Sequence, residues 1–155
     1  MLQAGKELWK LYTNGTASKE GSGIGLILQS PNGKEITYVF RFNFQVSNNE
    51  AEYQALLAGL RLAKEVCAKK LAALSDSVLM INQINGTYED KDPRMQKYLD
   101  AVHSLTNTFK SFSIKQISQG KNGREDTLSK LASTSYDHLT KKVLVEVLPE
   151  RSIDN

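Results

Sequence analysis

The sequence holds very little cysteine or histidine: one cysteine and two histidines among 155 residues. Cys67 alone excludes an internal disulfide and every zinc site built from several thiolates. His103 and His138 lie on unrelated segments, which argues against a histidine-based metal centre. No apolar run is long enough for a transmembrane helix, and the first residues lack the hydrophobic region of a secretory signal. We therefore expect an intracellular protein that is not secreted and has no membrane partner.

Neither sign of charge is in large excess. Lys and Arg number 20 and Asp and Glu number 17, which gives a net charge of +3. This balance permits a nucleic-acid partner without indicating one. Hydrophobic residues make up 40% and charged residues 24%, as is usual for a globular protein, so disorder of the whole chain is excluded. The length predicts one compact domain.

The first third of the chain has the pattern of three consecutive strands. Residues 8–13 are rich in aromatic and other strand-forming types and run into the turn dipeptide Asn14-Gly15, where we expect the first strand to end. Residues 21–28 form a second apolar strand, and residues 35–44 alternate with a period of two. Short connections between them predict an antiparallel meander.

The period then changes to that of helices. A long helix is predicted from Asn48 and Asn49, one of which would be its N-cap, to about Cys67, which we expect to be a core thiol. The later segments alternate: a strand over residues 70–74, helices over 78–84 and from 92–93 to about 109, a strand over 112–117, and a helix from 124 to about 135. The order βββαβααβα predicts an α/β fold with a mixed sheet flanked by helices. Residues 136–155 depart from it and can be an added strand, a docking segment or a linker.

Four polar residues fall where strands end or helices begin: Asn14, Glu52, Asp76 and Asp126. Such positions gather at one edge of an α/β layer, where ligands bind. Carboxylates that converge without histidine or cysteine favour Mg²⁺ or Mn²⁺. Two such ions about 3.5–4 Å apart drive phosphodiester cleavage. A purely structural interpretation stays open at this point, because Glu52 and Asp126 can simply stabilise helix N-termini and Asp76 can be an N-cap.

Four segments carry a resemblance to a known family: LYTNGTAS at residues 11–18, NNEAEYQAL at 48–56, SDS at 75–77 and DTLSKLAS at 126–133. They resemble type 1 ribonuclease H, and most closely the ribonuclease H domain of plant Gypsy-type LTR retrotransposon polyproteins. The resemblance assigns residues 6–135 to that domain and residues 136–155 to a C-terminal extension or linker toward a following domain. It implies a ribonuclease H-like fold whose five-stranded mixed sheet has the order 3-2-1-4-5.

The resemblance also implies a function. It implies endonucleolytic cleavage of the RNA strand of an RNA–DNA hybrid, with two Mg²⁺ ions for which Mn²⁺ can substitute. The catalytic and metal-binding positions would be Asn14, Glu52, Asp76 and Asp126. Glu52 is chosen over Glu50 because it directly precedes the run Tyr-Gln-Ala. Substrate contacts are implied for Gly15, Thr16, Ala17, Asn48 and Asn49. Neighbouring reverse transcriptase and integrase domains, and a location in a cytoplasmic particle or the nucleus, are implied as well.

The chain departs from the family at two places. Asn14 stands where the family has the aspartate expected to bridge both ions, so the activity of this chain is expected to be weak or lost. Whether Asn14 is natural or engineered stays open. The loop at residues 118–124 lacks the histidine of the cellular enzymes. Two alternatives remain: a non-catalytic connection module of the same fold that binds nucleic acid, and an integrase or resolvase core, against which the 48–60 signature and Asp126 argue.

Overall fold

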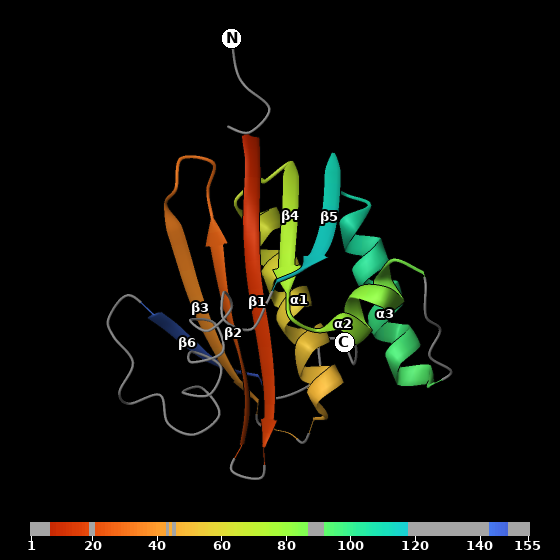
Figure 1. Ribbon diagram of the computed structural model, residues 1–155. Helices are drawn as coiled ribbons and strands as arrows, with labels where there is room; N and C mark the ends of the chain where they lie inside the picture. Colours follow the sequence, from red (N-terminus) through yellow and green to blue (C-terminus); the bar gives the residue numbers. More distant parts are fainter. Residues whose placement is uncertain are drawn as a thin grey trace.

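The computed structural model describes residues 7–18, 21–42, 44, 46–86, 92–117 and 143–148, with side-chain surroundings for these except 16–18, 21–22 and 143–148. Its strands form a single mixed sheet in the order β5-β4-β1-β2-β3-β6 (Figure 1). The elements are β1 (Leu8–Ser18), β2 (Gly21–Gln29), β3 (Glu35–Phe42), α1 (Asn48–Glu65), β4 (Lys70–Ser75), α2 (Val78–Ile84), α3 (Pro93–Thr106), β5 (Ser111–Gln116) and β6 (Val143–Leu148). The predicted strand order 3-2-1-4-5 is confirmed. The predicted helix at 124–135 lies outside the described residues.

The strand β1 is longer than predicted. Asn14 pairs with Gly25 and Gly15 with Ile24, and the antiparallel pairing with β2 continues to Ser18↔Gly21. The prediction that β1 ends at Asn14-Gly15 is therefore wrong, and the hairpin reverses only after Ser18. The physical reason is the long pairing partner, since β2 offers a hydrogen-bonding edge along all of β1 and this outweighs the local turn preference.

A sixth strand extends the predicted five. Residues Val143–Leu148 pair in parallel with β3, from Thr37↔Val143 to Phe42↔Leu148. The sequence left residues 136–155 open between an added strand and two other interpretations, and for this segment the added strand is what forms. At the other edge, β4 and β5 run parallel to β1, with α1 as the first crossover and α2 and α3 in the second.

The helix α1 has an N-cap and a C-terminus that differ from the prediction. Its N-cap is Ser47, whose hydroxyl accepts from the Glu50 N–H at 3.1 Å, so neither Asn48 nor Asn49 is the cap. It ends at Glu65, where the N–H groups of Cys67 and Ala68 donate to Lys64 O and Ala63 O. This is a Schellman motif, and it holds Cys67 at φ 61°. Cys67 is exposed, so its prediction as a core thiol is wrong.

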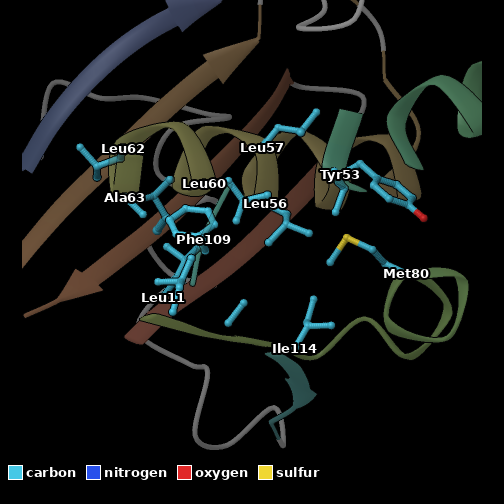
Figure 2. Close-up of a cluster of buried hydrophobic side chains, with 14 of the residues drawn as sticks. Leu11, Tyr53, Leu56, Leu57, Leu60, Leu62, Ala63, Met80, Phe109 and Ile114 are labelled. Carbon is cyan, nitrogen blue, oxygen red and sulfur yellow. The ribbon is translucent and has the colours of Figure 1, made fainter. Parts of the chain in front are cut away.

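The main core lies between α1 and the sheet and continues under α2 and α3. Figure 2 shows Leu56 and Leu60 on the side of α1 that faces Leu11 of β1. A Cβ at Gly59 would lie 2.5 Å from a Leu11 methyl carbon, so the missing side chain lets α1 approach β1 closely. Each fully buried leucine contributes roughly 1.5–3 kcal/mol to stability, so this contact fixes α1 on the sheet. No helix in the described part of the chain is long and apolar enough to cross a membrane.

Candidate active site where β1, α1 and β4 meet

Asn14 and Asp76 occupy corresponding places on two neighbouring parallel strands. The β1–β4 pairing ends at Tyr12↔Leu74, and Asn14 and Asp76 each come two residues later in the chain. Asn14 is only 5% exposed, whereas Asp76 is half-buried just after the end of β4. Because β1 continues past β4, Asn14 lies inside a strand and not at a strand end as predicted. By the register of the pairing, the two residues nevertheless lie at the same edge of the parallel part of the sheet.

Glu52 is brought to the same place through Gly15. The Gly15 N–H donates a hydrogen bond to Glu52 Oε1. A Cβ on Gly15 would lie 2.3 Å from the Ala51 carbonyl carbon, so the backbones of β1 and α1 touch there. Glu52 is 8% exposed. Its carboxylate therefore contacts the residue that follows Asn14 in the chain, while the Glu50 carboxylate contacts Tyr98 of α3.

The contacts of Asp76 and Glu52 do not agree with the interpretation that these residues only cap or stabilise helix N-termini. Ser77, not Asp76, is the N-cap of α2, and its hydroxyl accepts from the Met80 N–H at 3.3 Å. The Glu52 carboxylate accepts from a strand N–H, which is a contact to β1 and not to the end of its own helix. These two carboxylates are thus not explained by helix capping.

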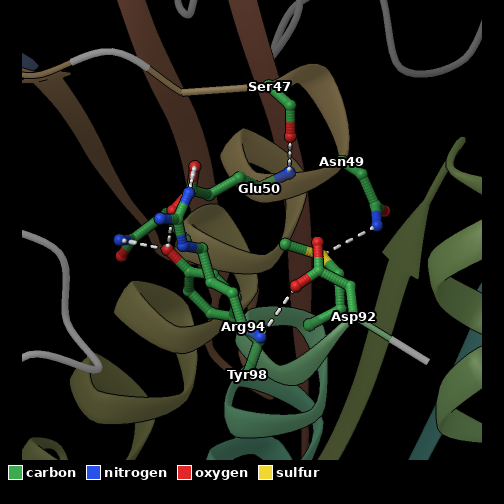
Figure 3. Close-up of polar contacts among 8 residues, drawn as sticks. Ser47, Asn49, Glu50, Asp92, Arg94 and Tyr98 are labelled. Carbon is green, nitrogen blue, oxygen red and sulfur yellow. Dashed lines mark hydrogen bonds and ion pairs between the residues drawn. The ribbon is translucent and has the colours of Figure 1, made fainter. Parts of the chain in front are cut away.

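A buried polar network adjoins the site, and the sequence interpretation missed it. The Tyr98 hydroxyl of α3 donates to Glu50 Oε2 at 2.7 Å and accepts from Gln54 Nε2 at 2.9 Å (Figure 3). Arg94 Nη1 lies 4.0 Å from Glu50 Oε1. Glu50 is 2% exposed and Tyr98 and Gln54 are fully buried. The available signal was the four-residue spacing of Glu50 and Gln54, which puts two polar groups on one otherwise buried helix face.

The residues predicted to contact substrate lie around this edge. Asn48 is exposed at the start of α1. Thr16 and Ala17 continue β1 and pair with β2. The side-chain surroundings of Thr16 and Ala17 are not among those described. Asn49 donates from Nδ2 to Met95 Sδ at 3.1 Å (Figure 3). Its Oδ1 is buried and has no hydrogen-bond partner among the described residues.

The predicted metal site is only partly within the described residues. Asp126 and the loop at 118–124 lie outside them. In the part of the chain that is described, no group of three or more His, Cys, Asp and Glu residues could hold a metal ion. Among the described residues, the candidate ligands are the amide of Asn14 and the carboxylates of Glu52 and Asp76. Hard oxygen donors of this kind fit Mg²⁺ or Mn²⁺, although the set has one negative charge fewer than with aspartate at position 14.

Comparison with known sequences gives one family and several distant relatives. The family described as reverse transcriptase-like matches residues 12–132. An uncharacterised protein of Bacillus subtilis, YpeP, is 29% identical over 140 residues, which cover 86% of this chain and 58% of that protein. Ribonuclease HI of Halobacterium salinarum is 27% identical over 108 residues, which cover 70% of this chain and 54% of that protein. The chain thus spans little more than half the length of these relatives.

Solved structures share the fold. RNase H1 from Halobacterium salinarum superposes with a TM-score of 0.76 at 25% identity, covering 81% of this chain and 96% of that one. LC11-RNase H1, solved in complex with an RNA/DNA hybrid, gives 0.71 at 23% identity, with 79% and 94% covered. The protease-reverse transcriptase of prototype foamy virus gives 0.66 at 15% identity, with 88% of this chain and 22% of that one covered. The last two likenesses concern the fold alone.

Proposed function

Since this chain belongs to the reverse transcriptase-like family of ribonuclease H fold, we propose that it binds RNA–DNA hybrids and derives from an endonuclease that cleaves their RNA strand. The observation that carries the proposal is the junction at Gly15, where the N–H holds the Glu52 carboxylate beside Asn14. A carboxylate on α1 would have no need of this contact if it only stabilised the helix. The relatives that are named ribonucleases H support the same activity class.

We propose Asn14, Glu52, Asp76 and Asp126 as the residues that would hold two Mg²⁺ ions, or Mn²⁺ in their place. When bound, such ions activate the attacking water and stabilise the leaving oxygen. Glu52 is held in place by the Gly15 N–H, and Asp76 lies at the end of the neighbouring strand. Asn14 offers a neutral amide oxygen, a weaker ligand than the carboxylate of aspartate. We therefore expect this chain to cleave hybrid weakly or not at all.

The proposed substrate contacts come from β1 and from the start of α1. Backbone groups of Gly15, Thr16 and Ala17 would meet the RNA 2′-hydroxyls, which distinguish RNA from DNA. Asn48 and Asn49 at the start of α1 would contact the hybrid. The buried and unpartnered Oδ1 of Asn49 supports this assignment, because a buried acceptor without a partner is costly unless a ligand or a small movement satisfies it.

We also propose that the chain is one part of a longer polyprotein. Residues 6–135 would form its ribonuclease H domain, and residues 136–155 an extension toward a following domain, with β6 joined to the sheet. A neighbouring reverse transcriptase domain is proposed on the sequence resemblance. A following integrase, the plant Gypsy-type origin and the location in a particle or the nucleus rest on the sequence resemblance alone.

One observation favours a second function. Asn14 removes the carboxylate on which both ions would depend, and a protein that no longer cleaves can still bind hybrid. A non-catalytic connection module of ribonuclease H fold is therefore the alternative.

The decisive experiment compares this chain with Asn14→Asp in a hybrid-cleavage assay, in Mg²⁺ and in Mn²⁺. Asn14→Asp is expected to raise the cleavage rate by orders of magnitude, mostly in the chemical step, because it would restore a carboxylate that could hold the ions. The control is Asn14→Asp combined with Asp76→Asn, which should return cleavage to the level of the parent. Equal, slow cleavage by the parent and Asn14→Asp would favour the connection module.

A further inference from the structure

The Tyr98 hydroxyl bridges two consecutive turns of α1. It donates to Glu50 Oε2 at 2.7 Å and accepts from Gln54 Nε2 at 2.9 Å. Glu50 and Gln54 are four residues apart, so their side chains lie one above the other on the same face of the helix. All three groups are buried. One side chain of α3 therefore fixes the rotation and the height of the first two turns of α1.

Those same two turns are held from the opposite side by β1. The Gly15 N–H binds Glu52, and the Gly15 and Ala51 backbones are in contact. On the α3 side, Asn49 binds Met95 Sδ at 3.1 Å. The start of α1, which carries Asn49 and Glu52, thus contacts β1 on one side and the first two turns of α3 on the other.

We infer that Tyr98 and Glu50 are positioning residues, which hold the start of α1 so that Asn49 and Glu52 present their side chains to an RNA–DNA hybrid. This inference rests on the proposed function. Neither residue touches the substrate, since Tyr98 is fully buried and Glu50 is 2% exposed. They act through the helix to which they are bonded.

The chemistry of Glu50 favours positioning over stability. Burying a carboxylate is costly even when it is paired, and well-packed apolar residues commonly give equal or greater stability at such sites. Directional hydrogen bonds, in contrast, fix one arrangement of two helices. Arg94, whose side chain is 53% exposed, lies 4.0 Å from Glu50 and places a positive charge at the solvent-exposed end of the network.

The chain offers a matched control for the Tyr98 hydroxyl. Tyr53 is also fully buried, its ring stacks on that of Tyr98 at 5.6 Å between centroids, and its hydroxyl donates to Gln83 Oε1 at 2.7 Å. Gln83 belongs to α2, so this hydrogen bond joins the same part of α1 to α2 and involves neither Glu50 nor Asn49. Tyr98→Phe and Tyr53→Phe each remove one buried hydroxyl and leave the ring in place.

The test measures the affinity of the full chain for a labelled RNA–DNA hybrid by fluorescence anisotropy, together with urea unfolding of each variant. Tyr98→Phe is expected to weaken hybrid binding by about fivefold or more, and Tyr53→Phe by less than about twofold, at a comparable loss of unfolding free energy. Equal affinities of the two variants would overturn the inference. Absence of salt-sensitive hybrid binding by the parent chain would overturn the proposed function, and the inference with it.

Glu50 provides a second comparison that does not depend on Tyr98→Phe folding. Glu50→Gln keeps an oxygen that can accept from the Tyr98 hydroxyl, whereas Glu50→Ala removes it. A positioning role predicts that Glu50→Gln binds hybrid nearly as tightly as the parent and that Glu50→Ala binds about fivefold or more weakly. Equal losses in both Glu50 variants would show that the charge matters and not the hydrogen bond, against the inference.

Discussion

The Gly15 N–H and the Glu52 carboxylate are joined by a hydrogen bond across 37 positions of the sequence. This bond places an acidic side chain of α1 against the middle of β1, next to Asn14. It requires that the two backbones touch, which only glycine at position 15 permits. The distance between α1 and β1 at the candidate site is therefore set by Gly15, which has no side chain.

Gly15→Ala is expected to destabilise the fold and to weaken hybrid binding. The new Cβ would lie 2.3 Å from the Ala51 carbonyl carbon and 2.7 Å from the Glu52 backbone nitrogen, and backbone atoms cannot move aside as a flexible side chain can. We expect a loss of about 3 kcal/mol in unfolding free energy, measured by urea denaturation. Gly33→Asn is the control, because position 33 is open and asparagine tolerates its φ of +90°. A loss no larger than that of the control would contradict the close contact.

Hybrid affinity is expected to fall steadily as salt concentration rises, whatever the base sequence, because phosphate contacts release counterions. Double-stranded DNA should bind more weakly than hybrid, and equal affinities would speak against recognition of the 2′-hydroxyls. Fluorescence anisotropy across a salt series measures both effects.

Asn48→Ala is expected to weaken hybrid binding by about three- to tenfold with little change in stability, since Asn48 is exposed at the start of α1. Asn49→Ala should weaken binding too, but it also removes the contact to Met95. Its loss of unfolding free energy should therefore exceed that of Asn48→Ala. Binding unchanged in both variants would remove these residues from the proposed interface.

Deamidation is expected to be slower at Asn14 than at Asn32 and Asn85, which belong to two of the three other Asn-Gly pairs of the chain. The reaction needs attack by the following backbone nitrogen on the asparagine side chain. Asn14 is buried in β1 and the Gly15 N–H is bonded to Glu52, whereas Asn32 and Asn85 are exposed. Peptide mapping of protein aged at alkaline pH should show modification at Asn32 and Asn85 at rates about tenfold or more above the rate at Asn14.

Unfolded protein should lose this difference between the three sites. Any aspartate formed at Asn14 would restore the carboxylate of the family, so hybrid cleavage should rise in proportion to it. If aspartate accumulates at position 14 of folded protein while cleavage stays at background, the missing carboxylate is not what limits the chain.

Cys67→Gly is expected to stabilise the protein by about 1 kcal/mol. Cys67 has a φ of 61° at the end of α1, a conformation that costs a residue with a Cβ and costs glycine little. Thermal unfolding should show a higher Tm for Cys67→Gly and a lower one for Cys67→Val, because a β-branched residue tolerates this conformation least. The same Tm for all three proteins would contradict the assigned helix end.

The sequence by itself determined most of the strands and helices among the described residues. The alternation through Ile36, Tyr38 and Phe40 predicted β3, and α2 has the predicted bounds, since both patterns are local. The order of the first five strands also followed from the resemblance. The choice of Glu52 over Glu50 rested on neighbouring residues, and the contact of Glu52 with Gly15 agrees with it.

Only the tertiary structure decided the conformation of residues at which contacts with distant segments outweigh the local sequence preference. Asn14-Gly15 is a turn signal, yet it lies within a strand because β2 pairs along its whole length. The helix C-terminus, and not apolar patterning, sets the conformation of Cys67 and leaves it exposed. The bond between Tyr98 and Glu50 joins residues 48 positions apart. No periodicity encodes such a contact, because it depends on how two helices pack after both have formed.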